Sequence, residues 1–385
     1  MIPYGSHNIS EEDIAAVNAV LQSDFLTQGP AIERFERAVA EYCGARRAVA
    51  VSNATAALHI ACMALDLGQG DLAWTSPNTF VASANSVLYC GADIDFIDID
   101  PVSWNLSPSL LAKRLSEAQA LGRLPKILLP VHFSGQSCDM QEIGRLAKEY
   151  GVAVIEDASH AIGASFLGDK VGCCNYSDCA VFSFHPVKII TTGEGGVVVT
   201  NRDDLADRLL RLRSHGITRD RILMTEKNPG PWYYEQLELG YNYRMTDIQA
   251  ALGASQMNRL EAFVGQRREL AARYDKLFAD LPLQLPVQDA RVRSSWHLYV
   301  VRLRLREITK THRQVFDGLR SAGIGVNLHY IPVHLQPYYR TRGFSEGHCP
   351  EAERYYGEAI SLPLFPALSE ANQDYIVATL RDLLS

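Results

Sequence analysis

Short β-rich runs alternate with helical segments over the first half of the chain, and this alternation restricts the fold more than any other feature. The β-rich runs occupy residues 47–52, 71–76, 92–100, 126–133, 152–157, 179–184 and 195–200. Helical segments follow several of them, from Thr55, over 79–89 and near 140–150. A βαβ rhythm indicates a mostly parallel sheet covered by helices on both faces. After residue 184 the connections become short, so we expect part of the sheet to be antiparallel.

The second half of the chain has a different pattern. A long charged helical stretch at 256–281 precedes the β-rich segment 296–305 and a helix-rich end. A chain of 385 residues that is 47% hydrophobic can bury a large core and a smaller one. We therefore expect a large domain with an N-terminal arm at 1–255 and a smaller domain at 256–385.

Charge and composition exclude several classes of partner. The net charge of −7 comes from acidic and basic residues spread along the chain, with no basic run that would follow a phosphate backbone. We therefore expect neither nucleic acid nor an anionic membrane surface as partner. No apolar segment is long enough to span a bilayer either. The start of the sequence lacks a signal-peptide pattern, which predicts a cytoplasmic protein. The eight cysteines lack zinc-site spacing and are expected to be buried or incidental thiols.

Lys188 stands in an unusual place, within FSFHPVKIITTGEGG at 182–196. It follows a β-rich run and a proline instead of lying on a polar helical face. An amine that is shielded from water has a lowered pKa and can form a Schiff base with an aldehyde. The alternative is a solvated loop lysine, and this segment alone leaves both interpretations open.

Asp157 ends a second informative segment, the buried run at 152–157. The carboxyl edge of a parallel sheet is where open α/β folds bind ligands, and Asp157 is expected to face that crevice while Glu156 points the other way. A carboxylate beside a pyridine nitrogen keeps it protonated, so that the ring can accept electrons. A helix N-cap or a metal ligand remains an alternative.

Two strand-to-helix junctions could hold further parts of a ligand. The turn at 52–57 is made of small and hydroxylated residues, and its backbone amides and the Thr55 hydroxyl can bind a phosphate at the helix start. Helix capping alone would explain the same residues. Phe80, which is expected to open the next helix, can stack on a flat heterocycle or simply pack in the core.

Taken together in this order, the four segments resemble the sugar-nucleotide aminotransferases of the DegT/DnrJ/EryC1/StrS family. Supporting motifs are FLTQGP followed by FE (25–30 and 35–36), GYNYRMTDIQAALG (240–253), GVNLHYIPVHLQPYYR (325–340) and ISLPLFP (360–366). The resemblance covers essentially the whole chain. It implies an α/β fold, the pyridoxal-phosphate-dependent transferase fold type I of aspartate aminotransferase. That fold has a large domain with a mixed, mostly parallel sheet and a smaller C-terminal α+β domain.

The resemblance also implies the cofactor and the residues around it. Pyridoxal 5′-phosphate would form a Schiff base with Lys188, and Asp157 would contact its pyridine nitrogen, which makes these two residues the catalytic pair. The other cofactor contacts are His160 near the ring hydroxyl, Phe80 stacked on the ring, Ala54, Thr55 and Ser183 at the phosphate, and Asn242 at the phosphate of the neighbouring subunit's cofactor. Active sites of this family lie at a dimer interface, so a homodimer is implied.

Within the family, the chain is similar to members that transfer the amino group of L-glutamate to C4 of a UDP-linked 4-keto-6-deoxy-N-acetylhexosamine in pseudaminic acid biosynthesis. The shared motifs are PYG near the start, SDFLTQGP, SFHPVKIITT and GVNLHYIPVH. This similarity implies that the sugar nucleotide contacts Tyr4, Asp24, Phe25, Leu26, Thr27, Asn327, Leu328, His329 and Tyr330. Arg244 is a candidate for binding glutamate.

Several other functions remain to be weighed. Another 4-keto or 3-keto sugar nucleotide could be the substrate, and a non-catalytic regulatory homologue is a further alternative, although Lys188 and Asp157 are both present. Dehydratases of the family have a histidine in place of this lysine. A dinucleotide oxidoreductase would need a G-x-G-x-x-G loop where this chain reads SNATAALHIA. No metal is expected, because His329 and His334 lack accompanying ligands.

Overall fold

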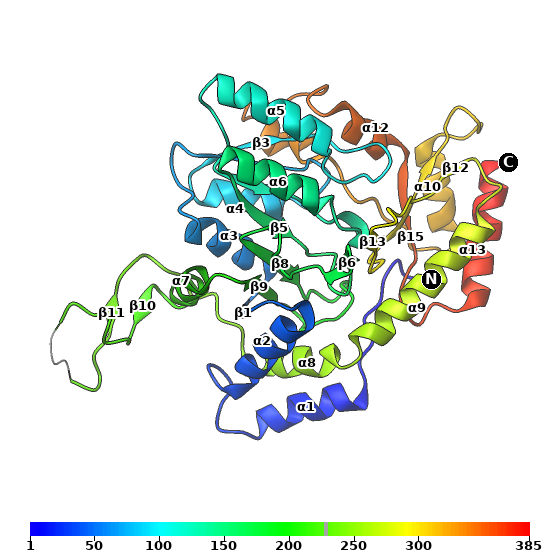
Figure 1. Ribbon diagram of the computed structural model, residues 1–385. Coiled ribbons are helices and arrows are strands. Elements are labelled where there is room, and N and C mark those ends of the chain that lie inside the picture. The colour runs from blue at the N-terminus through cyan, green and yellow to red at the C-terminus, as the bar shows by residue number, and fades with distance from the viewer. Residues whose placement is uncertain (227–229) are drawn as a thin grey trace.

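The computed structural model describes residues 1–226 and 230–385 and is built around a seven-stranded sheet of order β1-β9-β8-β5-β4-β2-β3 (Figure 1). The strands are β1 (Arg47–Val51), β2 (Leu72–Thr75), β3 (Asp93–Phe96), β4 (Ile127–Leu129), β5 (Ala153–Asp157), β8 (Cys179–Ser183) and β9 (Gly196–Thr200). The strands from β3 to β8 in this order pair in parallel, and β9 pairs antiparallel with β8 and β1. The predicted mixed, mostly parallel sheet is confirmed.

Helices cover both faces of this sheet. They are α1 (Glu11–Leu21), α2 (Pro30–Cys43), α3 (Ala54–Ala64), α4 (Ala82–Tyr89), α5 (Pro108–Ala120), α6 (Met140–Tyr150), α7 (Asp203–Arg213) and α8 (Asp247–Met257). Val181 packs in the core with α3, α4 and α7, whereas its neighbours Ala180 and Phe182 pack with α2 and α8. Successive side chains of a strand point to opposite faces of the sheet. Because helices cover both faces, β8 is buried on both sides and is apolar nearly throughout.

Two helix boundaries differ from the sequence prediction. Helix α4 begins at Ala82, so Phe80 lies in the loop before the helix and does not open it. The amide of Asn85 donates to the carbonyl of Val81, whereas the amide of Ser83 reaches back only to Phe80. The stretch 256–281 is also not one helix, because α8 ends at Met257 and α9 spans Leu260–Leu277. Short-range bonds such as the one from the Asn258 amide to the Ser255 carbonyl close α8 at this point.

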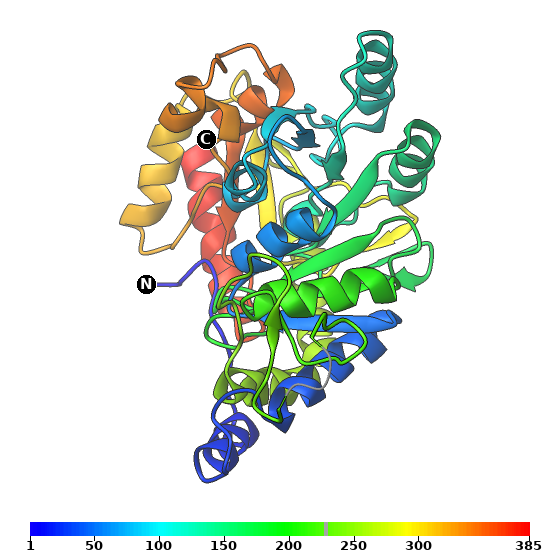
Figure 2. The ribbon, with the colours of Figure 1, turned by 90° about the vertical axis from the view of Figure 1, so that its left-hand side faces the viewer.

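The C-terminal part of the chain forms a three-stranded antiparallel sheet with helices beside it. The sheet has the order β12-β14-β15, with β12 (Leu283–Gln284), β14 (Tyr299–Leu303) and β15 (Ala359–Leu362), and the helices include α9, α10 (His312–Ser321), α11 (Pro337–Arg340), α12 (Pro350–Glu358) and α13 (Glu370–Leu384). Both chain ends lie on this side (Figure 2), where Ile2 pairs with Ile324. We propose that the smaller domain begins at about residue 256, at the break before α9.

Further short elements complete the chain. They are η1 (Phe133–Gly135), β6 (Ser165–Phe166), β7 (Asp169–Lys170), β10 (Ile217–Thr218), β11 (Glu235–Gln236), β13 (Val292–Arg293) and η2 (Val333–Leu335). Strands β10 and β11 belong to an arm, residues 217–226 and 230–240, that projects from the body (Figure 1). No helix among the described residues is both long and apolar enough to cross a membrane.

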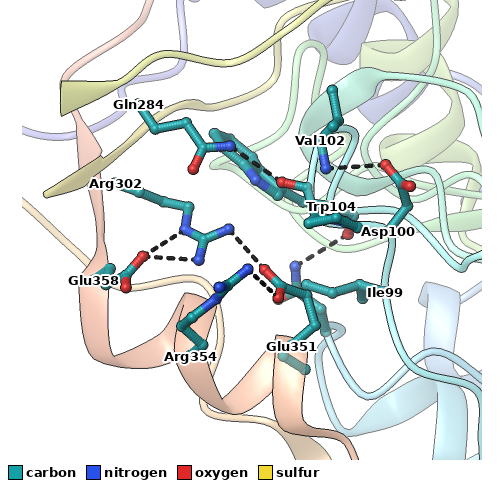
Figure 3. A network of polar contacts seen from close by, with 12 residues as sticks. Ile99, Asp100, Val102, Trp104, Gln284, Arg302, Glu351, Arg354 and Glu358 are labelled. Atoms are coloured by element: carbon teal, nitrogen blue, oxygen red, sulfur yellow. Dashed lines mark hydrogen bonds and ion pairs between the residues drawn. The ribbon is translucent and has the colours of Figure 1, made fainter. Parts of the chain in front are cut away.

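An ion network centred on the buried Arg302 lies between the C-terminal sheet and α12 (Figure 3). Arg302 on β14 is almost completely buried and pairs with Glu358 at 2.7 Å and with Glu351 at 3.0 Å, and Arg354 binds Glu351 from the other side. Asp98, which follows β3, accepts hydrogen bonds from the first amides of α12. These contacts attach α12 to β14 on one side and to the loop after β3 on the other.

Candidate active site

Lys188 and Asp157 lie at the carboxyl ends of two neighbouring strands. Asp157 is the last residue of β5, and Lys188 lies in the turn after β8, where its amide donates to the His185 carbonyl at 2.8 Å. Burial lowers the pKa of the Lys188 amine to about 8, and the negative charge of Asp157 partly opposes this shift. About a tenth of the amine is therefore neutral and nucleophilic at pH 7, far more than for an ordinary lysine.

The Asp157 carboxylate is fixed by two serines. Its Oδ2 accepts from Ser83 Oγ at 2.6 Å, and its Oδ1 accepts from Ser159 Oγ at 2.6 Å and from the Ser159 amide at 3.1 Å. Glu156 points to the opposite side, where it contacts His132 at 2.7 Å, as the alternation along the strand predicted. Asp157 thus presents a buried carboxylate whose orientation does not depend on solvent.

His160 is held between Ser134 of the large-sheet part and Tyr330 of the C-terminal part of the chain. Its Nδ1 accepts from the Ser134 amide at 3.3 Å, and its Nε2 lies 3.0 Å from the Tyr330 hydroxyl. Burial and the nearby Lys188 charge keep the pKa of His160 well below its usual range, so the ring is neutral. Because the Ser134 amide can only donate, the hydrogen of the neutral ring is on Nε2 and is donated to Tyr330.

Two further histidines, His329 and His297, lie near Lys188. His329 contacts Ser361 Oγ at 2.8 Å through Nδ1, and burial lowers the pKa of His329 to about 3. His297 packs against His160 with ring centroids 4.4 Å apart, and its pKa is also well below the usual value because of burial. These imidazoles are neutral and add no positive charge beside Lys188. Among the described residues, no group of three or more His, Cys, Asp or Glu could hold a metal ion.

The predicted phosphate turn stands at the start of α3, beside the same sheet edge. Asn53 caps the helix by accepting from the Ala56 amide at 2.9 Å, and the leading amides of Ala54 and Thr55 have no partner within the helix by geometry. Gly196 packs directly against this turn, since a Cβ there would lie 2.6 Å from the Asn53 carbonyl. Ser183 pairs with Gly196 on the adjacent strand, which brings it to the turn.

Predicted substrate residues and the predicted cofactor residue Phe80 gather around His329 and Tyr330. The Tyr4 ring lies 5.6 Å from the His329 ring, and the Phe80 ring lies 6.3 Å from the Tyr330 ring. Phe80 is 59% exposed, so one of its faces is open to a ligand. Asn327 pairs with Ser361 on β15 and accepts from the Leu328 amide at 2.8 Å, which fixes the start of this turn.

Two predicted groups do not join this cluster. The loop formed by Asp24, Phe25, Leu26 and Thr27 is exposed and is attached to the start of α8, where the Asp247 amide donates to the Leu26 carbonyl at 2.9 Å. Asn242 is also exposed and pairs with Ser214 beside the arm. Arg244, in contrast, pairs with Val51 directly before the phosphate turn.

The structure also brings in residues that the sequence did not single out. They are Ser83, Ser134, Ser159 and His297. Ser159 had a local signal, because a serine two residues after an aspartate can bond back to its carboxylate. Ser83 lies 74 residues from Asp157, and His297 lies 137 positions after His160, shortly before β14, so no short motif pointed to them.

Comparison with known proteins gives one consistent family. The model of the DegT/DnrJ/EryC1/StrS aminotransferase family matches residues 7–381. The spore coat polysaccharide biosynthesis protein SpsC of Bacillus subtilis is 38% identical, covering 100% of this chain and 97% of that protein. The UDP-4-amino-4,6-dideoxy-N-acetyl-beta-L-altrosamine transaminase of Campylobacter jejuni is 36% identical, with coverage of 100% and 98%. PseC of Helicobacter pylori, an aminotransferase of pseudaminic acid biosynthesis, superposes with a TM-score of 0.90 at 29% identity, covering 100% of this chain and 99% of its own.

Proposed function

This chain belongs to the DegT/DnrJ/EryC1/StrS aminotransferase family and is a sugar aminotransferase, and from that premise we propose that it transfers the amino group of L-glutamate to C4 of a UDP-linked 4-keto-6-deoxy-N-acetylhexosamine. The observation that carries this proposal is the amine of Lys188, a half-buried residue on which the Asp157 charge acts and whose pKa is lowered to about 8. Such an amine can attack a carbonyl and exchange protons near neutral pH. The choice of sugar is supported by the similarity to the Campylobacter transaminase.

The residues present fit pyridoxal phosphate, the cofactor that the family implies. Bound there, this group supplies an aldehyde that accepts amino groups and a ring that holds the electrons released at the substrate carbon. Lys188 would hold it covalently, the fixed carboxylate of Asp157 suits a protonated pyridine nitrogen, and the open start of α3 at Ala54 and Thr55 suits its phosphate. The exposed ring of Phe80 offers a stacking face.

The chain's own groups determine how protons move. Lys188 Nζ, once free, is the group that removes a proton from the donor and later returns one to the product. The pKa near 8 places both protonation states within reach. His160 stays neutral and donates from Nε2 to Tyr330, so the Tyr330 hydroxyl hydrogen is left free to point toward a ligand oxygen.

The substrate site would be shared between two copies of the chain. Tyr4 and the turn Asn327–Tyr330 would contact the sugar nucleotide from the chain that carries Lys188. The loop Asp24–Thr27 and Asn242 lie apart from that cluster, and they would act in the partner's site. A homodimer is supported by the apolar side chains exposed on the arm, among them Ile222 at 90%, Trp232 at 78% and Leu239 at 72%.

One alternative has a specific observation in its favour. The relative with 38% identity is a spore coat polysaccharide biosynthesis protein, so the substrate could be a different keto sugar nucleotide of the same class. A non-catalytic homologue is disfavoured, because Lys188 and Asp157 are both present and the Asp157 charge acts on the Lys188 amine.

Incubation of the purified holoenzyme with L-glutamate and a panel of keto sugar nucleotides tests the substrate. The panel should contain UDP- and dTDP-linked 4-keto sugars, with and without the N-acetyl group, and one 3-keto sugar. We expect amination of the UDP-linked N-acetylated 4-keto sugar with the highest kcat/KM. Preferred amination of another panel member would overturn the proposed sugar, and no amination of any member would overturn the substrate class.

Subunit mixing tests the shared site. Lys188→Ala removes the amine from one chain, and Asn242→Asp places a negative charge where the partner's phosphate is expected. Each variant alone should be nearly inactive. Mixed dimers contain one site with both native residues, so mixing equal amounts should restore about a quarter of the wild-type activity for a two-fold symmetric dimer. No recovery after confirmed subunit exchange would contradict a shared site.

A further inference from the structure

Two thiols meet where α3 packs against α4, away from the residues assigned to the proposed function. Cys62 on α3 is fully buried, and Cys90, directly after α4, is partly exposed. Both contact Ser86: Cys62 Sγ lies 3.8 Å from its hydroxyl oxygen, and Cys90 Sγ lies 3.4 Å from its carbonyl oxygen. Cys90 Sγ also lies 4.0 Å from the His59 carbonyl, on the turn of α3 that precedes Cys62. The two sulfurs therefore occupy the same contact between the helices.

An imidazole with an unused nitrogen completes this cluster. His59 is buried, its Nδ1 lies 3.2 Å from the Tyr243 hydroxyl, and its Nε2 has no hydrogen-bond partner among the described residues. If the hydroxyl donates to Nδ1, the ring hydrogen is on Nε2, and leaving a buried donor without an acceptor has an energetic cost. A negatively charged sulfur nearby would remove that cost.

The surroundings of Cys90 favour its thiolate. The Cys62 thiol and then the His59 imidazole lower the pKa of Cys90 to about 6 against the opposing effect of burial. Cys173 has the same intermediate exposure, but burial raises its pKa. Burial also raises the pKa of Cys43, Cys174, Cys179 and Cys349. Unlike these five cysteines, Cys90 has thiolate character, and its neighbours cause it.

We propose that Cys90 and Cys62 form a thiol–disulfide exchange site that reacts with low-molecular-weight disulfides such as glutathione disulfide. The Cys90 thiolate attacks one sulfur of the disulfide, the sulfur–sulfur bond breaks, and one glutathione thiolate leaves. Cys62 then attacks the Cys90 sulfur of the mixed disulfide, and the second glutathione thiolate leaves. The proton of Cys62 passes to a glutathione thiolate. Two protein thiols are oxidised to one disulfide while glutathione disulfide is reduced to two thiols.

The position of the pair connects it to the candidate active site. Helix α3 begins at the phosphate turn, and α4 carries Ser83, which binds the Asp157 carboxylate. Ser86, which contacts both cysteines, also donates to the Ser83 carbonyl at 2.8 Å. A disulfide between Cys62 and Cys90 would join two helices whose first turns face the proposed cofactor.

Titration of the reduced holoenzyme with dithiobis(nitrobenzoate) tests the proposal. We expect a fast phase that releases two thionitrobenzoate ions per chain and leaves no label, with a loss of two hydrogen atoms by mass spectrometry and a linked Cys62–Cys90 peptide. Cys62→Ser should release one ion and keep the label on Cys90, and Cys90→Ser should lose the fast phase. Cys173→Ser is the matched control and should keep it.

The pH dependence of the fast phase tests the role of the neighbours. In the wild type its rate should rise through about pH 6, because the thiolate is the nucleophile. His59→Gln should move this midpoint to higher pH while the circular dichroism spectrum stays unchanged. Labelling of Cys90 no faster than that of Cys173, or a label retained on wild-type Cys90 as on Cys62→Ser, would overturn the exchange site.

Discussion

The cofactor half of the candidate site and the exposed segments assigned to the partner's site are built in different ways. Lys188, Asp157 and His160 are held by contacts within one chain, with distances from 2.6 to 3.3 Å around the carboxylate and the imidazole. Asn242 and the loop 24–27 are exposed, and they form no hydrogen bonds with Lys188, Asp157 or His160 among the described residues. The single chain thus positions the groups proposed for the chemistry, whereas the proposed role of the exposed segments would require a second copy.

The largest effect is expected from Lys188→Ala, which tests whether the chemistry depends on the buried half alone. Loss of the nucleophile and proton-transfer group should lower kcat by ~10⁴-fold or more. Pyridoxal phosphate should still bind reversibly, as measured by equilibrium dialysis. Lys148→Ala removes an exposed lysine and should be indistinguishable from the wild type. Appreciable turnover by Lys188→Ala would place the essential amine elsewhere.

Asp157→Asn should have the second-largest effect. The substitution keeps the shape of the side chain but removes the charge that is expected to face the pyridine nitrogen, and kcat should fall by ~10²–10³-fold. Glu156→Gln is the matched control on the same strand, because Glu156 faces His132 on the other side of the sheet. That variant should melt at a lower temperature but keep its kcat. Equal losses of kcat in both variants would remove the special role of Asp157.

The pH dependence of cofactor attachment should show a smaller, graded effect. The Lys188 amine is protonated below its pKa of about 8 and neutral above it. The neutral fraction therefore rises from about one in a hundred at pH 6 to about half at pH 8, a ~50-fold increase. Borohydride trapping on the apoenzyme should show covalent attachment accelerating over this range and levelling above it. Asp157→Asn should shift the midpoint downward, since the Asp157 charge raises this pKa. A rate independent of pH between 6 and 8 would contradict the assignment.

The smallest effect is expected at the arm and concerns the exposed half. Trp232→Ser removes an aromatic side chain that is 78% exposed, and it should weaken dimerisation ~10-fold because such residues often anchor interfaces. Analytical ultracentrifugation over a dilution series would measure this change. Leu121→Ser, at the position directly after α5 that is 75% exposed, is the control and should leave association unchanged. An unchanged dimer in Trp232→Ser would show that the arm is not part of the interface.

The sequence predicted the elements that depend on local patterns. Each strand of the large sheet was expected from apolar runs, and the positions of Lys188 and Asp157 followed from their places at strand ends. The helix boundaries were less accurate, as at Phe80 and near residue 258, because they depend on single hydrogen bonds that neighbouring residues can satisfy in several ways.

By itself the sequence determined the order of strands and helices along the chain, the family, and the candidate lysine and aspartate. Each of these is encoded within a few neighbouring residues or in a series of spaced motifs. Only the tertiary structure decided which side chains contact the candidate site residues. Ser83 meets Asp157 across 74 residues, and Tyr330 meets His160 across 170. Such contacts depend on how the sheets and helices pack against one another, and no local pattern specifies that packing.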